Sequence, residues 1–165
     1  MTLETSLLLF KFILAAGLTV WMVVVAINNL TAFKGGVASL GMTMSMQLFE
    51  QAPAIDSPLL SRRVTATFWH RLVYTTVVIM ECAVAILLFC GAASLLGAVP
   101  GWVDVGDAII RMNVGLSALL AMSFVLLLGG AWFAYYIRQD LLQITHFVLI
   151  AVTIVAALFM NIPTA

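Results

Sequence analysis

The sequence predicts an all-α integral membrane protein, in which four helices cross a bilayer as a four-helix bundle. Of its 165 residues, 64% are hydrophobic and only 8% are charged, whereas a soluble domain is about half apolar and a quarter charged. The few charged residues leave four apolar runs of about 20 residues or more, the length that a bilayer requires. Such runs predict helices, because the strands of a membrane barrel are shorter and alternate between apolar and polar residues.

The four predicted helices cover residues 7–33, 68–97, 112–137 and 141–162. Only residues 138–140 separate the last two helices, so we expect these two to form an antiparallel hairpin. No linker or repeat divides the sequence, and its length suits one domain. We therefore expect residues 1–165 to form a single transmembrane domain.

A single long connection, residues 34–66, joins the first two predicted helices and contains Pro53 and Pro58. Within it, residues 40–49 are apolar enough to form a helix that lies in the membrane interface. The methionines at positions 42, 44 and 46 alternate with other residues, which also fits an extended strand. This loop is where the sequence allows structure outside the membrane.

The charges of the connections predict an orientation. With four spans, the long loop and the short turn share one side of the membrane. That side holds Lys34, Arg62, Arg63, Arg71 and Arg138. The other side has only Lys11 and Arg111 as cations, so the positive-inside rule predicts a cytoplasmic loop 34–66 and external termini. We expect the membrane to be the inner membrane of a bacterium.

Glu81 lies well inside the second predicted helix, where a carboxylate is costly in lipid. One interpretation is structural, with Glu81 either protonated or paired with Lys11 or Arg71. The other is functional, with Glu81 as the proton-relay or ligand-binding acid of a small transporter or channel. Asn28 and Asn29, near the end of the first helix, are the other predicted intramembrane polar residues.

Two histidines, His70 and His146, fall near the same end of the second and fourth helices. At a shared depth they could ligate haem b, although an interfacial residue and a packed core histidine would give the same pattern. Tyrosines and a basic residue gather at this end and suggest a quinone headgroup site as a further alternative: Tyr74, Tyr135, Tyr136 and Arg138.

Met42, Met44 and Met46 supply thioethers, the soft ligands that select Cu(I). No Cys or His lies near them in sequence, and methionine also serves as a flexible apolar contact residue. We therefore favour docking on lipid or on a partner over copper binding.

Small residues on the third predicted helix recur at the spacing that lets helix backbones approach closely. They form two pairs, Ser117 with Ala121 and Gly130 with Ala134. We expect this helix to be a packing helix, and the spacing leaves open whether its partner is in this chain or in another subunit.

No catalytic or cofactor motif occurs in the sequence, so we do not expect an enzyme. Seven Lys and Arg residues balance seven Asp and Glu residues, which argues against nucleic acid as a partner. We expect a non-catalytic membrane subunit that contacts lipid and other integral membrane subunits, and stabilises a larger complex such as a respiratory or oxidase-type one. The alternatives are a haem b- or quinone-handling anchor of a dehydrogenase, and a small transporter or channel.

Three short motifs are similar to those of a known family. They are Ile27-Asn28-Asn29-Leu30-Thr31, Trp69-His70-Arg71-Leu72 followed by Glu81, and Gly129-Gly130-Ala131-Trp132-Phe133-Ala134. In these motifs and in the order of its spans, the chain resembles the predicted small integral membrane proteins of domain of unknown function 2165. That family tends to carry an acidic residue where Ala131 stands and a Met-Asp pair in the first loop, so we expect a divergent member. The resemblance implies this fold and no particular activity.

Overall fold

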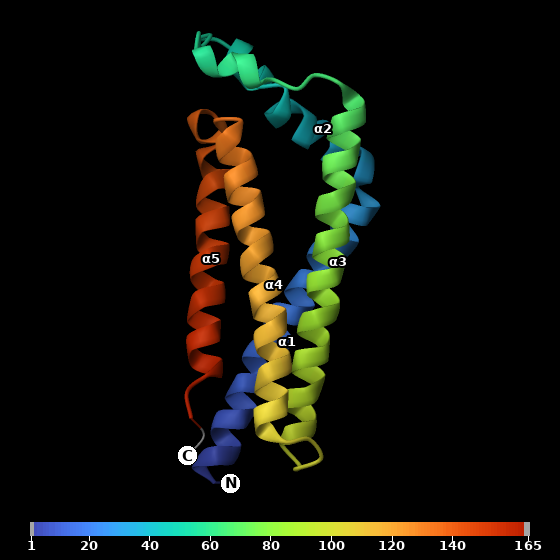
Figure 1. The fold of residues 1–165 in the computed structure, drawn as a ribbon, viewed down its shortest axis with the longest axis vertical. Helices are drawn as coiled ribbons and strands as arrows, with labels where there is room; N and C mark the ends of the chain where they lie inside the picture. Colours follow the sequence, from blue (N-terminus) through green and yellow to red (C-terminus); the bar gives the residue numbers. More distant parts are fainter. Residues whose placement is uncertain (1, 164–165) are drawn as a thin grey trace.

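The computed structural model of the protein describes residues 2–163 and confirms an all-helical fold with four long apolar helices (Figure 1). No β-strand occurs within these residues. The elements in chain order are α1 (Leu3–Thr31), α2 (Phe33–Met44), the 3-10 helices η1 (Gln47–Glu50) and η2 (Pro58–Arg62), α3 (Thr67–Ala98), α4 (Val105–Trp132), the 3-10 helix η3 (Tyr135–Ile137) and α5 (Asp140–Met160).

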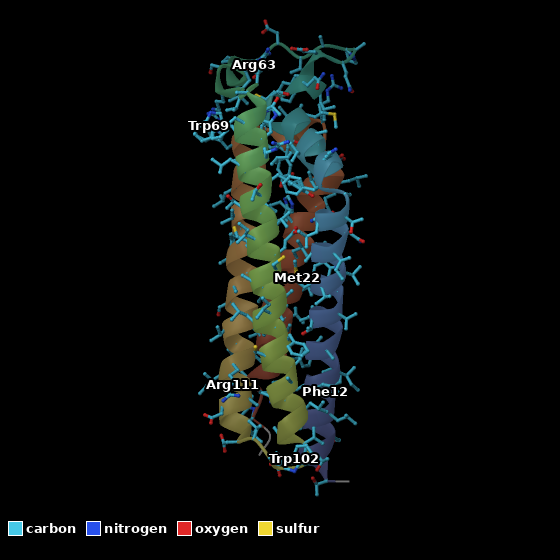
Figure 2. All side chains as sticks on the ribbon, turned by 90° about the vertical axis from the view of Figure 1, so that its right-hand side faces the viewer. Phe12, Met22, Arg63, Trp69, Trp102 and Arg111 are labelled. Atoms are coloured by element: carbon cyan, nitrogen blue, oxygen red, sulfur yellow. The ribbon has the colours of Figure 1, made fainter. Side chains whose placement is uncertain are left out.

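Helices α1, α3, α4 and α5 are long and apolar enough to span a membrane. Both termini lie at one end of the bundle, and α2 and the α4–α5 turn lie at the other (Figure 1), as four spans require. Trp69 and Arg63 mark the α2 end of the bundle, while Trp102 and Arg111 mark the end with the termini (Figure 2). Tryptophan and arginine are typical of the two membrane interfaces.

Two helices begin earlier than the charge-free runs predict. Helix α1 begins at Leu3 because the Thr2 side chain caps it, accepting a hydrogen bond from the backbone N–H of Thr5 at 3.1 Å. Helix α4 begins at Val105, seven residues before the predicted start, because Asp104 caps it in the same way through Asp107. The charged residues of the first turns of α4 are exposed, so they are compatible with a helix end that leaves the apolar layer.

Helix α4 also ends earlier than predicted, at Trp132 instead of residue 137. Ala134 adopts a left-handed conformation with φ of 51°, which stops the helix, and the chain continues as the short helix η3. The small-residue pair Gly130 and Ala134 therefore does not form a face of one helix. Instead, Gly130 lies under the ring of Tyr135, where a methyl group would come within 2.6 Å of Cε2.

The predicted interfacial helix 40–49 is displaced along the chain. The helix that forms is α2, Phe33–Met44, and Met46 ends the helical stretch with a left-handed φ of 53°. Two glycines explain why the helix starts earlier than predicted, since their lack of a side chain lets α2 pack closely against α3. A methyl group on Gly36 would overlap the Tyr74 ring, and one on Gly41 would lie 2.7 Å from His70 Nδ1.

A close contact between helix backbones joins α3 to α4 near the end with the termini. A methyl group on Gly91 would lie 2.6 Å from Met112 Cα, and one on Gly115 would lie 3.0 Å from Leu88 N. From there the two helices diverge toward the opposite end, where α2 crosses between α3 and the α4–α5 hairpin (Figure 1). The bundle is therefore closed at one end and bridged by α2 at the other.

Substitution of Gly91 by Ala should destabilise the bundle by about 1–3 kcal/mol, because the added methyl group meets the backbone of α4. The measurement is the thermal unfolding midpoint of the purified protein in a mild detergent. Gly17→Ala is the matched control, since a methyl group there has no neighbour within 4 Å and alanine favours the helix. Equal stability of the two variants would show that the α3–α4 contact is looser than described.

Candidate functional site

A cavity of about 270 Å³ lies beneath α2, at the end where the bundle opens. All five α-helices and η3 contribute residues to its wall. The lining residues are Asn29, Gly36, Ser39, Leu40, Thr43, Tyr74, Val77, Leu126, Gly130, Tyr135, Leu142 and His146. Four apolar side chains, Leu40, Val77, Leu126 and Leu142, form part of this wall. Several of its polar residues form hydrogen-bonded pairs.

Glu81 of α3 is bonded to α1 beside this cavity. Its side chain is 4% exposed, and Asn29 Nδ2 donates to both carboxylate oxygens, at 2.8 Å to Oε1 and 2.9 Å to Oε2. Tyr74 lies next to this pair, with its hydroxyl 3.4 Å from the Asn29 carbonyl oxygen. Amide donors lower the cost of a buried carboxylate, so the Glu81–Asn29 pair fixes α1 against α3 within the apolar layer.

Neither Lys11 nor Arg71 is the partner of Glu81, so the ion-pair form of the structural interpretation is wrong. Lys11 is buried and donates to the carbonyl oxygen of Ile162 at 2.6 Å, so it ties α1 to the C-terminal end of α5. Arg71 is exposed and lies ten residues before Glu81 on the same helix, or about 15 Å along the axis. Asn28, next to Asn29, is exposed and takes no part in the pair.

A second buried pair joins α5 to the turn before it. Tyr135 Oη lies 3.0 Å from Nδ1 of His146, and the two rings stack with centroids 5.7 Å apart. Burial raises the pKa of Tyr135, so the hydroxyl is protonated at neutral pH. Beside this pair, the Thr43 hydroxyl donates to Gln139 Oε1 at 2.9 Å, which links α2 to the same turn.

The two histidines do not share a cavity. His146 lines the inner cavity beneath α2, whereas His70 lines a separate outer cleft on the other side of that helix. His70 Nε2 is already 2.7 Å from the carbonyl oxygen of Val64. The arrangement therefore does not present the two imidazoles to one haem iron.

The three methionines also do not converge. Because α2 is helical, Met42 and Met44 point about 160° apart around its axis. Met42 is exposed, while Met44 is buried and Met46 packs with Phe49 and Ala134 in a small apolar cluster. This placement fits their alternative role as apolar contact residues.

The small residues of α4 separate into two groups. Gly115 packs within the chain against α3, although the spacing argument did not select it. Ser117 and Ala121, which it did select, are exposed. Ser117 lines an apolar groove of about 690 Å³ between α4 and α5. The sequence-predicted packing face thus lies on the outside of this chain.

The site holds three polar pairs, Glu81 with Asn29, Tyr135 with His146, and Thr43 with Gln139. Within residues 2–163, no three His, Cys, Asp or Glu side chains come together in a way that could hold a metal ion. Sequence reasoning missed Thr43 and Gln139, because both lie in predicted connections, where a polar residue is ordinary and does not stand out by its hydropathy. It also missed the close approach at Gly36 and Gly41, because Gly35 and Gly36 form a glycine pair at the start of the predicted loop, and such a pair is typical of a turn.

Replacement of Asn29 by Ala should lower the free energy of unfolding by about 1–3 kcal/mol, because it leaves the buried Glu81 carboxylate without its donor. Asn28→Ala should have little effect, since that neighbouring amide is exposed. Unfolding of both variants, of Glu81→Ala and of the Asn29→Ala/Glu81→Ala double variant would give the coupling energy of the pair. A coupling near zero would contradict the assignment.

Comparison with known proteins agrees with this architecture and adds no activity. Residues 7–163 match a family described as "Predicted small integral membrane protein (DUF2165)". No curated protein and no solved structure matches the chain. Because the family match covers nearly the whole chain, from the first span to the last, this protein belongs to the predicted small integral membrane proteins of the DUF2165 family.

Proposed function

We propose that the protein is a non-catalytic membrane subunit that associates with and stabilises a larger membrane complex, such as a respiratory or oxidase-type one. The observation that carries this proposal is the exposed small-residue face of α4 beside the α4–α5 groove. In lipid, apolar exposure alone gives no drive for association, whereas small residues permit close backbone packing. A transmembrane helix of another subunit is the partner that suits this face.

The geometry of this face supports a helical partner. Ser117 and Ala121 lie about 40° apart around α4, and larger exposed residues flank them along the same side: Ile110, Phe124 and Leu128. Across the groove, α5 contributes Ile154, Ala157 and Leu158. A shallow centre between larger flanking side chains is the shape into which a helix packs closely.

The buried polar groups support a structural role. Glu81, Lys11, His70 and His146 each have a hydrogen-bond partner inside the chain. Glu81 is 4% exposed, and both of its oxygens accept from the amide of Asn29, which suits a carboxylate that joins two helices. The geometry therefore favours a rigid subunit over a small transporter or channel.

We place this subunit in a bacterial inner membrane with the α2 end in the cytoplasm. The support is the charge distribution: five cations lie at that end, against two at the end with the termini. The five are Lys34, Arg62, Arg63, Arg71 and Arg138. The positive-inside rule assigns the cation-rich side to the cytoplasm.

The role of the exposed small-residue face of α4 in partner binding can be tested by placing larger side chains on it. Ser117→Ile and Ala121→Ile should each reduce recovery of partner subunits at least tenfold, because a branched side chain keeps a partner helix from approaching. The measurement is purification from the native membrane in a gentle detergent, with quantitative mass spectrometry of co-purifying proteins and a visible spectrum of the sample.

The matched control for this experiment is Ala83→Ile, since Ala83 is exposed on α3, away from the α4–α5 groove. It should retain the partners and the same thermal stability. If the wild-type protein is recovered alone, or if Ala83→Ile loses partners as readily as Ala121→Ile, the proposal fails. Recovery of a homo-oligomer that only the α4 variants dissociate would identify a second copy as the partner.

A second candidate function, binding of a quinone headgroup, rests on the inner cavity. There the Tyr135–His146 pair offers a hydroxyl and an imidazole beside an apolar wall that includes Leu126 and Leu142. A quinone carbonyl needs one or two such donors and an apolar slot. The cavity would place that headgroup at the α2 end of the bundle.

If this second candidate is correct, Tyr135→Phe should lower the quinone retained by the purified protein about tenfold, because the hydroxyl beside His146 is lost. Extraction with solvent followed by chromatography measures the quinone content. Tyr136→Phe is the control, since Tyr136 is exposed. Absence of quinone from the wild-type sample, or equal loss in both variants, would exclude this function.

A further inference from the structure

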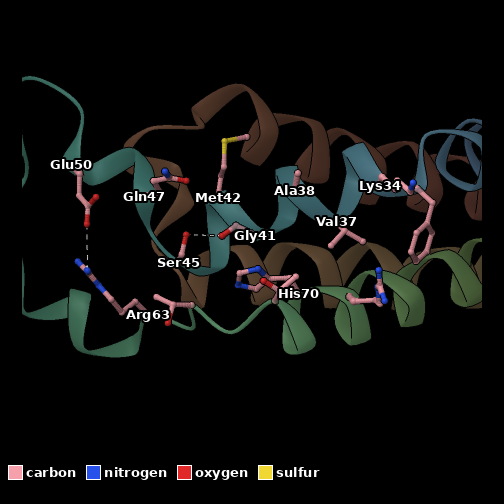
Figure 3. A pocket seen from close by; sticks show the side chains of 14 residues that line it. Lys34, Val37, Ala38, Gly41, Met42, Ser45, Gln47, Glu50, Arg63 and His70 are labelled. Atoms are coloured by element: carbon pink, nitrogen blue, oxygen red, sulfur yellow. Dashed lines mark hydrogen bonds and ion pairs between the residues drawn. The ribbon is translucent and has the colours of Figure 1, made fainter.

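We propose that the outer cleft between α2 and the start of α3 binds the phosphate of an anionic phospholipid headgroup. The cleft has a volume of about 650 Å³ and is separate from the inner cavity and from the α4–α5 groove. Figure 3 shows Val37 and Ala38 of α2 above His70 of α3, with Lys34 toward one end of the cleft and Arg63 beside Glu50 at the other. This site is independent of the partner-binding face proposed above.

The cleft is basic although the chain as a whole is neutral. Its lining includes the cations Lys34, Arg63 and Arg71 and a single carboxylate, Glu50, so three positive charges against one negative charge leave +2. Glu50 is 3.4 Å from Arg63. Within residues 2–163, Lys34 and Arg71 form no salt bridge, which leaves these two cations available to an anion.

Hydrogen-bond donors accompany the charges. Thr65 and Thr67, which each carry a hydroxyl group, line the cleft. Helix α3 begins at Thr67 without a side-chain cap, although the Trp69 N–H donates to the Ala66 carbonyl oxygen at 3.0 Å, and the positive end of the helix dipole favours an anion. Cations together with hydroxyl and amide donors are what a phosphate group requires.

The position of the cleft favours a lipid over a soluble phosphate. Helix α3 has 32 residues and is about 48 Å long, whereas the hydrocarbon layer is about 30 Å thick. If the helix is centred in the bilayer, roughly six residues at each end reach the headgroup layer, and Arg71 is the fifth residue of α3. Phe68 and Trp69 beside it are exposed, at 68% and 51%, and such aromatic residues are typical of the membrane interface.

The cleft also has an apolar part that a soluble phosphate would not need. Phe33, Val37 and Met42 line it together with the cations. These side chains can contact the glycerol and the first methylene groups of an acyl chain while the phosphate lies between Lys34 and Arg71. A phospholipid headgroup with at least one net negative charge satisfies both parts.

The test is native mass spectrometry of the detergent-purified full chain, titrated with dioleoyl phosphatidic acid, dioleoyl phosphatidylglycerol or dioleoyl phosphatidylcholine. We expect tighter binding of the two anionic lipids than of phosphatidylcholine. Lys34→Gln/Arg71→Gln should weaken anionic lipid binding about twenty-five-fold, because each cation near the surface contributes roughly a factor of five. Arg62→Gln, which removes a cation at the same end but outside the cleft, should change it less than about threefold.

A second variant adds a charge and removes no contact. Ala38→Glu places a carboxylate on the exposed wall of the cleft and should weaken anionic lipid binding by a similar factor, with an unchanged thermal midpoint as evidence that the fold is intact. Equal binding of all three lipids, or equal losses in Arg62→Gln and Lys34→Gln/Arg71→Gln, would overturn the proposal. Displacement of phosphatidic acid by millimolar inorganic phosphate or glycerol 3-phosphate would overturn it in favour of a soluble phosphate ligand.

Discussion

Close contact between the backbones of α3 and α4 is the constraint on which the rest of the bundle depends. Lipid provides no hydrophobic drive between helices, so packing and hydrogen bonds must hold them together. Gly91 and Gly115 allow this contact near the loop that joins the two helices. Because the helices diverge from that point (Figure 1), the opposite end of the bundle needs another element to fill it.

Helix α2 meets that need and determines where polar groups can be placed. It contacts α3 through Gly36 and Gly41 and the α4–α5 turn through the Thr43–Gln139 hydrogen bond. The space beneath α2 is wide enough for polar side chains to find partners, which explains why the Tyr135–His146 pair lies there and Glu81–Asn29 beside it. At the closed end, the buried Lys11 instead donates a hydrogen bond to the carbonyl oxygen of Ile162, just after α5.

The sequence predicts the spans well because hydropathy depends on composition along one helix. It predicts their ends less well, because ends depend on caps such as Asp104 and on single residues in left-handed conformation such as Ala134. Asn29 was recognisable as a polar residue inside the membrane. Its pairing with Glu81 was not, since hydropathy does not give the tilt and rotation of α1 against α3.

The expected pairing of Glu81 with Lys11 is wrong because the two residues lie at different depths in the bundle. In an antiparallel pair, Lys11 lies eight residues from the end of α1 at the termini, and Glu81 lies seventeen residues from that same end of α3. The difference of nine residues corresponds to about 13 Å along the axis. Lys11 therefore lies at a different depth from Glu81, and this axial separation keeps the two opposite charges from forming an ion pair.

The composition of the chain does not show how its charges are distributed in the folded protein. Seven cations balance seven anions in the sequence, yet in the folded chain Lys34 of α2 and Arg71 of α3 line one cleft that contains a single carboxylate. This arrangement follows from the same opening of the bundle that forms the inner cavity, because α2 must cross the end of α3 to fill the gap. The α4–α5 groove lies elsewhere, toward the termini, with Asn113 and Asn161 paired across it. A headgroup in the basic cleft and a helix in the α4–α5 groove would therefore occupy separate surfaces, so the protein can be held by lipid at one end while a partner packs along its side.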